Sequence, residues 1–220
     1  MDCFVHESAY VDDGAEIGAG TKVWHFAHVQ SGARIGRSCI LGQNVNIAND
    51  VEIGDNVKIQ NNVAVYTGTK VESDVFLGPS CVLTNVTNPR SQVKRHSLYE
   101  RILIRRGATV GANATVVCGI TLGRYSFVAA GATIARDVPD YVMVMGCPAR
   151  PYAYVSRHGH ILCRFGDVRE GEVYVCPESG YRYALKGGEM KCLDLGEDEP
   201  LPANLAVGRR TYDDFKKESR

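Results

Sequence analysis

Residues 35–65 read IGRSCILGQNVNIANDVEIGDNVKIQNNVAV, and a branched aliphatic residue returns in them at every sixth position. The same phase holds without a miss at fourteen positions: Val5, Val11, Ile17, Val23, Val29, Ile35, Leu41, Ile47, Ile53, Ile59, Val65, Val71, Leu77 and Leu83. After a break it resumes at Ile104, Val110, Val116, Leu122, Val128 and Ile134. A period of six fits neither an α-helical face nor simple strand alternation, and it is typical of a parallel β-helix of six-residue repeats. The sequence therefore predicts an all-β fold in which three repeats make one triangular coil.

Two further positions of the repeat support this interpretation. Four residues after each aliphatic stands a small or β-branched residue, such as Ala9, Thr21 or Ala33, which we expect to point inward. Three residues after the aliphatics, glycine, asparagine and aspartate predominate: Gly14, Gly20, Gly32, Gly68, Gly107, Gly119, Gly131, Asn44, Asp50, Asn56, Asn62, Asp74, Asn113 and Asp137. These residue types tolerate a positive φ at low cost, so this position is expected to turn the chain between short strands.

The period fails once, over residues 86–103, VTNPRSQVKRHSLYERIL. The distance from Leu83 to Ile104 is not a multiple of six, so the segment is predicted to be an inserted loop, and long loops in compact domains are usually functional. We divide the chain into a β-helix (residues 1–140), a connecting segment (141–158), a small β-hairpin module (159–198) and a polar, mobile tail (199–220). The boundary at residue 140 follows from Pro139, which cannot donate to a continuing strand ladder.

Net charge and hydrophobic patterning argue against some classes of function. The formal net charge is zero, so nothing drives the chain toward nucleic acid. No apolar run approaches the length of a membrane span, and the sequence starts without a basic and apolar signal region, so we expect a cytoplasmic protein without a membrane partner. Cys39 and Cys81 occupy inward positions of the repeat, where reduced core cysteines are expected.

The end of the repeat resembles a known family. Ala130-Gly131-Ala132, the Arg136–Pro139 segment and Gly146-Cys147-Pro148-Ala149-Arg150 are similar to the closing motifs of hexapeptide-repeat acyltransferases, although Cys147 stands where that family usually has asparagine. The resemblance implies a left-handed parallel β-helix, a homotrimer and acetyl-CoA as co-substrate. The left hand and the trimer rest on the resemblance alone.

Several motifs resemble one branch of that family, the sugar-nucleotide 3-N-acetyltransferases. They are VWHFAH (23–28), GQNV (42–45), KIQNNV (58–63), TNVTNPR (84–90) and RGATVGAN (106–113). The branch they resemble most transfers an acetyl group from acetyl-CoA to the 3-amino group of a UDP-linked 3-amino-2-acetamido uronic acid, in bacterial O-antigen and lipopolysaccharide synthesis. The alternatives are a transferase for a dTDP-3-amino-deoxyhexose, a non-catalytic β-helix scaffold and a metal-dependent hydratase. The CPESGY stretch (176–181) resembles a short hairpin that ends some relatives.

The inserted loop is the best candidate for substrate binding. Between Pro89 and Arg106 one acid, Glu100, stands against six cations: Arg90, Lys94, Arg95, Arg101, Arg105 and Arg106. Clustered cations suit a diphosphate, and a planar guanidinium also suits a uronate carboxylate. The alternative is a solvated basic loop. The substrate contacts that we predict are His28, Gln43, Asn44, Asn61, Tyr66, Arg90, Arg95 and Arg105.

Asn85 stands at the mouth of the loop and is the predicted catalytic residue. By resemblance, the matching asparagine lies beside the amine to be acetylated, where its amide oxygen can accept a hydrogen bond and orient the nitrogen lone pair. The alternative is a turn asparagine that caps the coil. His25 and His28 are candidate general bases, but His25 precedes Asn85 by about three coils, or roughly 14 Å. We therefore favour direct attack by the amine without a protein base.

Acetyl-CoA is expected along the last coils, an assignment that leans on the resemblance. Small residues at Gly111, Ala112, Ala129 and Ala130 would leave a smooth wall for pantetheine, with Pro148 beside them, and Arg136 and Arg150 would meet the phosphates. The alternative is that these are ordinary turn residues. No metal is expected, because His25 and His28 have no third ligand in the following coils.

Overall fold

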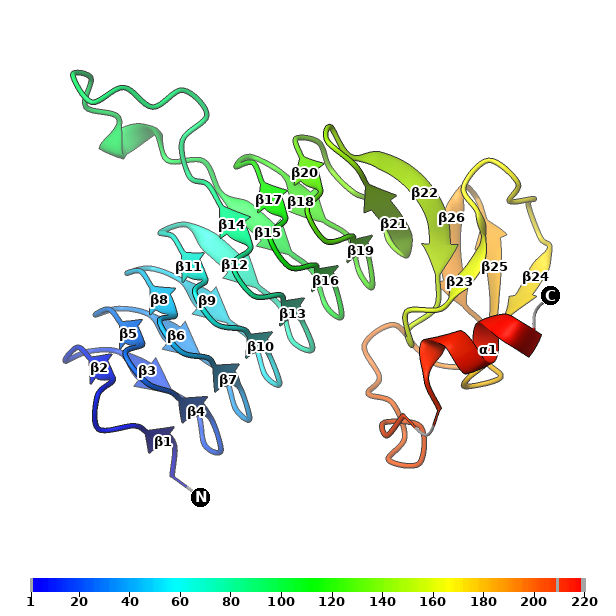
Figure 1. The fold of residues 1–220 in the computed structure, drawn as a ribbon, viewed down its shortest axis with the longest axis horizontal. Helices are drawn as coiled ribbons and strands as arrows, with labels where there is room; N and C mark the ends of the chain where they lie inside the picture. Colours follow the sequence, from blue (N-terminus) through cyan, green and yellow to red (C-terminus); the bar gives the residue numbers. More distant parts are fainter. Residues whose placement is uncertain (1, 209, 219–220) are drawn as a thin grey trace.

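The computed structural model describes residues 2–208 and 210–218, and its architecture is a left-handed parallel β-helix with a small module at its C-terminal end (Figure 1). Each coil contributes one short strand to each of three parallel sheets, which we name A, B and C in chain order. Strands one coil apart pair in parallel register, as in Tyr10 opposite His28 and His28 opposite Asn46. The predicted fold class is confirmed.

The strands of the prism are mostly two residues long. Sheet A holds β1 (Phe4–Val5), β4 (Lys22–Val23), β7 (Ile40–Leu41), β10 (Lys58–Ile59), β13 (Phe76–Leu77), β16 (Thr109–Val110) and β19 (Phe127–Val128). Sheet B holds β2 (Tyr10–Val11), β5 (His28–Val29), β8 (Asn46–Ile47), β11 (Ala64–Val65), β14 (Val82–Leu83), β17 (Thr115–Val116) and β20 (Thr133–Ile134). Sheet C holds β3 (Glu16–Ile17), β6 (Arg34–Ile35), β9 (Glu52–Ile53), β12 (Thr69–Val71), β15 (Ile102–Ile104) and β18 (Thr121–Leu122). The turns between them form three edges, which we name A/B, B/C and C/A.

The aliphatic at every sixth position forms the core. From Val23 to Ile134 these side chains are buried, and the small residues between them, such as Ala27, Ala33 and Cys39, fill the coil corners. Val5 is 39% exposed because the first coil has no neighbour beneath it. Burial of one Val, Ile or Leu contributes about 1.5–3 kcal/mol, so the stack is stable although a single coil is not.

The turn position behaves as predicted at thirteen of its fourteen Gly, Asn and Asp residues, which have positive φ. The exception is Asp137, whose carboxylate instead accepts the Thr121 N–H at 2.7 Å. Four residues of other types take the same left-handed conformation at the same position of the repeat: Phe26, Ser38, Ser80 and Tyr125. The stacked coils impose this backbone conformation even on side chains that disfavour it in isolation.

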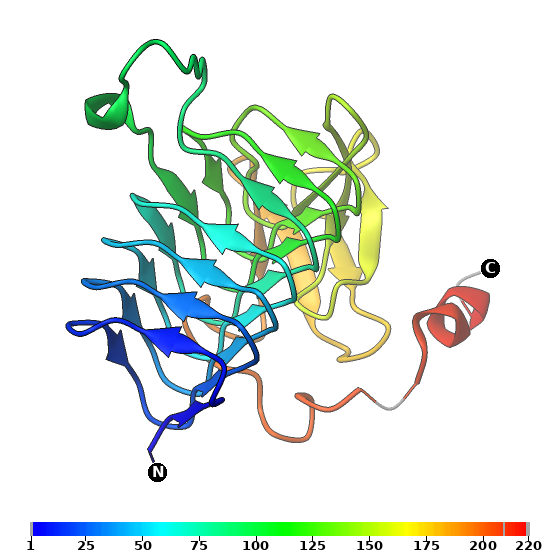
Figure 2. The ribbon, with the colours of Figure 1, turned by 60° about the vertical axis from the view of Figure 1, so that its left-hand side comes forward.

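The inserted loop leaves the B/C edge after β14 and returns at β15, and it projects away from the coils (Figures 1 and 2). Its regular structure is a single 3-10 turn, η1 (His96–Leu98), in the described part of the loop. The two ends meet, since the Glu100 N–H donates to the Asn85 carbonyl at 2.9 Å. The loop is thus an excursion that leaves the stacking of the coils intact.

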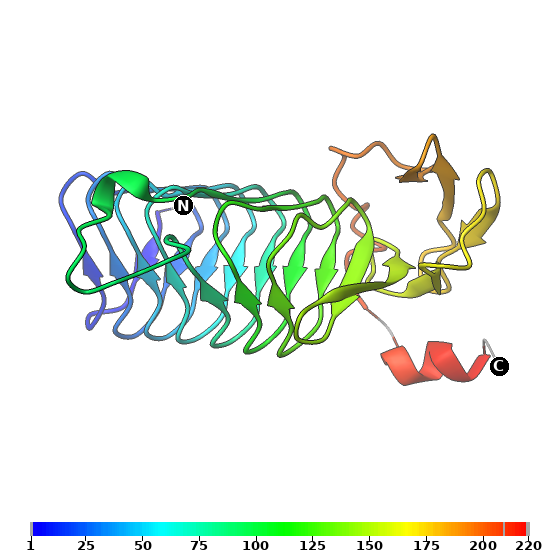
Figure 3. The same ribbon diagram turned by 90° about the horizontal axis from the view of Figure 1, so that it is seen from above.

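The predicted end of the β-helix at residue 140 is wrong. β21 (Val142–Met145) pairs in parallel with β19, so sheet A continues beyond Pro139, which lies in the turn before the strand. β22 (Arg150–Val155) and β23 (Ile161–Arg164) then add in antiparallel fashion, and no helix forms in the segment 141–158. Seen from above, the coils run along one axis and the C-terminal module covers their far end (Figure 3).

The C-terminal module contains a three-stranded antiparallel sheet of β24 (Val173–Val175), β25 (Arg182–Lys186) and β26 (Glu189–Cys192), within the residues predicted to form a small β-hairpin module. The tail predicted to be mobile contains α1 (Tyr212–Glu218), and its Phe215 is buried against the His160 ring at 4.8 Å. Residues 209, 219 and 220 of that predicted tail lie outside the described residues. None of the helices in the described part of the chain is long and apolar enough to cross a bilayer.

Candidate functional site

The loop and the B/C edge enclose a cleft of about 680 Å³. Its lining comes from the end of β14, from the loop and from the turn after β11, and includes Tyr66, Val82, Asn85, Arg90, Lys94, Arg95, His96 and Tyr99. Four predicted site residues, Tyr66, Asn85, Arg90 and Arg95, therefore meet in one place. No aspartate or glutamate is among the described residues that line the cleft, so it is a cationic site.

Arg95 has an unsatisfied donor in this cleft. Its Nε is buried and has no hydrogen-bond partner among the described residues. A buried donor without an acceptor costs about 1–3 kcal/mol, and an anionic ligand in the cleft would remove that cost. Arg90 donates through Nη1 to the Pro89 carbonyl at 3.1 Å and is otherwise exposed to the cleft.

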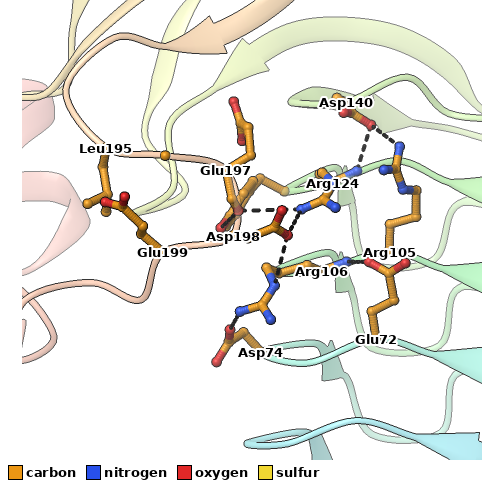
Figure 4. A network of polar contacts seen from close by, with 12 residues as sticks. Glu72, Asp74, Arg105, Arg106, Arg124, Asp140, Leu195, Glu197, Asp198 and Glu199 are labelled. Carbon is orange, nitrogen blue, oxygen red and sulfur yellow. Dashed lines mark hydrogen bonds and ion pairs between the residues drawn. The ribbon is translucent and has the colours of Figure 1, made fainter.

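The structure separates Arg105 from the other predicted substrate residues. β15 carries the chain across sheet C before residue 105, so Arg105 and Arg106 lie on the C/A edge (Figure 4). There Arg105 contacts Asp140 at 3.5 Å and Arg106 contacts Asp74 at 2.8 Å. The expected grouping of Arg105 with the loop cations is therefore wrong within one chain. Strand β15 lies between the loop and Arg105 and places Arg105 on another edge of the β-helix.

His28 lies in sheet B, in register with Asn46 and three strand steps from Val82. Its Nε2 is 2.7 Å from Asp12 Oδ1, and this contact holds the pKa of Asp12 below its usual value. Asp12 is not among the predicted site residues. The sequence feature that points to Asp12 is its separation from His28 along the chain, which is about one coil. Residues with that separation become neighbours on adjacent coils.

Gln43, Asn44 and Asn61 lie on the A/B edge and form part of a polar ladder. The Gln43 N–H donates to Asn61 Oδ1 at 2.9 Å, and Asn44 Nδ2 donates to Asn62 Oδ1 at 3.0 Å. These hydrogen bonds link adjacent coils, so the three residues have a structural role in addition to the predicted substrate contacts.

The predicted acetyl-CoA wall continues the same A/B edge. Gly111, Ala112, Ala129 and Ala130 lie in its last turns, and the Gly131 N–H donates to the Ala112 carbonyl at 2.8 Å. The turn that holds Pro148 joins them, because the Ala149 N–H donates to the Thr133 carbonyl at 2.8 Å. Gly111 is required by stacking, since a Cβ there would lie 2.5 Å from the Ala130 nitrogen.

The two phosphate contacts predicted for acetyl-CoA lie apart from each other. Arg136 is exposed on the B/C edge after β20, whereas Arg150 is exposed at the start of β22. The cleft beside the loop and the predicted acetyl-CoA wall thus lie on different edges of one chain, separated by sheet B. Across residues 2–208 and 210–218, no group of three or more His, Cys, Asp or Glu side chains could hold a metal ion.

Two family sequence profiles match the repeats. "Bacterial transferase hexapeptide (six repeats)" matches residues 14–49 and 50–85, and "Hexapeptide repeat of succinyl-transferase" matches residues 32–67 and 104–136. Neither profile extends over residues 86–103, where the period fails.

The chain is also similar to individual known proteins. The chain is 41% identical over 155 residues to the dTDP-3-amino-3,6-dideoxy-alpha-D-galactopyranose 3-N-acetyltransferase of Aneurinibacillus thermoaerophilus, covering 70% of this chain and 80% of that one. It is 29% identical to the bifunctional protein GlmU of Shouchella clausii, over 63% of this chain and 28% of that one. A hexapeptide-repeat acetyltransferase from Vibrio cholerae, solved with acetyl coenzyme A, is similar with a TM-score of 0.49 and 25% identity, over 57% of this chain and 72% of that one.

Proposed function

The chain belongs to the hexapeptide-repeat acyltransferase family and is an acetyl-CoA-dependent N-acetyltransferase of nucleotide-linked amino sugars, and we propose that its acceptor is the 3-amino group of a UDP-linked 3-amino-2-acetamido uronic acid. The observation that carries the choice of a uronic acid is the cleft at the interrupted repeat. It combines Asn85 with Arg90, Lys94 and Arg95 and has no acidic residue among its described lining. Such a substrate brings two kinds of anion, a diphosphate and a carboxylate.

Arg95 is the proposed partner of the uronate carboxylate. The buried, unsatisfied Nε supports this, because a carboxylate accepts two parallel hydrogen bonds from a guanidinium. Arg90 and Lys94 then remain for the diphosphate. Aromatic and apolar side chains of the same cleft, Tyr66 and Val82, supply a surface for the sugar ring.

The proposed reaction is direct attack. The neutral 3-amine donates a hydrogen bond to the Asn85 amide oxygen, and its lone pair adds to the carbonyl carbon of the acetyl thioester. As the tetrahedral intermediate collapses, the C–S bond breaks and the thiolate leaves. The proton lost by the amine passes to the thiolate, so the products are the amide and free CoA. Backbone N–H groups of the turns at Gly111–Ala112 or Ala129–Ala130 are the proposed oxyanion donors.

The separation of the two predicted half-sites supports an assembly with shared sites. The cleft lies on the B/C edge and the acetyl-CoA wall on the A/B edge, so thioester and amine would meet where the A/B edge of one chain faces the loop of another. A homotrimer with sites between subunits is the proposed form. Exposed apolar side chains on the loop and sheet B outside the cleft, such as Leu98 and Tyr10, are consistent with burial against a second copy.

A dTDP-3-amino-deoxyhexose is the second candidate acceptor. The observation that favours it is the 41% identity to an enzyme named for such a substrate. That sugar has no carboxylate, so it leaves Arg95 without its proposed partner.

The acceptor is identified by following release of free thiol from acetyl-CoA with a panel of 3-amino nucleotide sugars. We expect turnover with the UDP-linked uronic acid to exceed turnover with the dTDP-linked deoxyhexose. We also expect Arg95→Gln to raise the KM for the uronate by about 10- to 100-fold, which corresponds to the loss of a charge-assisted hydrogen bond. The KM for a neutral analogue, in which a hydroxymethyl group replaces the carboxylate, should rise less. Preference for the deoxyhexose would select the second candidate, and no thiol release with any amino sugar would refute both.

A further inference from the structure

Two side chains from different segments contact the carboxylate of Glu100 at the base of the loop, and its backbone binds a third segment. The hydroxyl of Thr87 donates to Glu100 Oε1, and the thiol of Cys118 contacts the same oxygen at 3.7 Å. The backbone N–H of Glu100 donates to the Asn85 carbonyl at 2.9 Å. Glu100 therefore contacts both the residue proposed to orient the amine and the segment that follows it.

The chain before Asn85 is held from the same side. The Cys118 N–H donates to Thr84 Oγ1 at 2.9 Å, and Cys118 is only 4% exposed. Gly119 follows with φ +80°, and a Cβ there would lie 2.7 Å from Glu100 Oε2. The carboxylate is thus packed against the Cys118–Gly119 turn of the next coil, which belongs to the rigid prism and not to the loop.

We infer that Glu100 is a positioning residue for the transfer, which fixes Asn85 by joining both ends of the loop to the Cys118–Gly119 turn of the β-helix. This inference rests on the proposed role of Asn85. Asn85 can aim the amine only if its own backbone is fixed, and it stands between Thr84 and Thr87, which are both tied to that turn. A loop without this anchor would still present its cations to the substrate, but the amide would lose its direction.

The inference predicts a specific kinetic signature. Glu100→Ala is expected to lower kcat by about 10- to 100-fold, the cost of a misplacement of about 1 Å. The KM values for acetyl-CoA and the nucleotide sugar should stay within about twofold, since no binding group is removed. Glu100→Gln should keep most of the activity, because its amide oxygen still accepts the Thr87 hydroxyl. Ser97→Ala, in the exposed η1 turn of the same loop, is the control and should behave as wild type.

A double-mutant cycle separates positioning from general damage. In an Asn85→Ala background, Glu100→Ala should cause no further loss, because it acts through the missing amide. Thr87→Val breaks the same anchor from the other side and should reproduce the kcat effect, which keeps the test available if Glu100→Ala does not fold. A wild-type kcat in Glu100→Ala, a rise in acceptor KM alone, or an equal loss in the Asn85→Ala background would each overturn the inference. If Asn85→Ala itself is fully active, the proposed role of Asn85 fails instead.

Discussion

Replacing Asn85 by alanine is expected to lower kcat for thiol release by about 100- to 1000-fold, the usual cost of removing a group that orients or stabilises the reacting centre. Asn85 is the polar residue at the point where the loop meets the cleft, and its backbone is fixed by Glu100 at 2.9 Å. Because the substrate would still be held by the loop cations, the KM for the nucleotide sugar should change little. Initial rates at saturating acetyl-CoA, with the sugar concentration varied, measure both parameters.

His28→Ala and His25→Ala are the matched comparisons. His28 lies three strand steps from Val82, roughly 14 Å within one chain, and its imidazole contacts Asp12. We expect both changes to leave kcat within about fivefold of wild type, well below the 10²- to 10⁴-fold contribution typical of a general base. If either histidine change abolishes turnover while the nucleotide sugar still binds, the mechanism without a protein base is wrong.

Arg157→Ala is expected to produce the largest loss of stability in the variants that we consider. The Arg157 side chain is 1% exposed and joins the β-helix to the C-terminal segment 195–199. Its guanidinium donates to the carbonyls of Gly196 at 2.7 Å and Glu199 at 3.1 Å, and lies over the Tyr125 ring at 4.5 Å. Removal leaves the Gly196 and Glu199 carbonyls without this donor, whereas Glu197 keeps the Tyr141 hydroxyl. The expected cost is about 3 kcal/mol or roughly 6–12 °C in Tm.

The readout is thermal unfolding together with hydrogen exchange of residues 195–199. Without Arg157 the segment keeps the hydrogen bond from the buried Tyr141 hydroxyl to Glu197 Oε2 at 2.6 Å. It also keeps the more exposed ion pair of Arg124 with Asp198 at 2.5 Å, which holds it less firmly (Figure 4). Arg182→Ala is the control, because Arg182 is 59% exposed and pairs only with Asp194 among the described acids, and it should lower Tm by less than about 3 °C. Since Arg157 lies on the C/A edge, away from the cleft, the variant should keep its kcat at 25 °C. A Tm equal to that of Arg182→Ala would contradict the proposed role.

The repeat made the β-helix predictable, because every six-residue repeat contains the same three features: one buried aliphatic residue, one small inward residue and one tight turn. The loop was predictable for the converse reason. The stacking of coils requires no break in the period, so an interruption indicates an inserted segment. Tyr66, Asn85, Arg90 and Arg95 line one cleft because they lie in the loop, at its mouth or in the turn one coil before it.

Other features depend on contacts that no local pattern encodes. Arg105 follows the loop in sequence, but β15 places it on another edge, beside Asp140. The continuation of sheet A through β21 is set by pairing with β19, which outweighs the expected stop at Pro139. The docking of the C-terminal segment through Arg157 joins residues about forty positions apart, between elements that share no repeat.

The central claim, that the interruption of the repeat forms the acceptor site, is tested most directly by excising it. Because Asn85 and Glu100 are hydrogen bonded at the base of the loop, residues 88–98 can be replaced by a short glycine linker without cutting the coil stack. Thiol release is then measured with acetyl-CoA and the 3-amino nucleotide sugar, alongside circular dichroism and acetyl-CoA binding. We predict a folded protein that binds acetyl-CoA but has lost transfer to the sugar. Turnover at the wild-type rate in the loop-excised protein would contradict the claim.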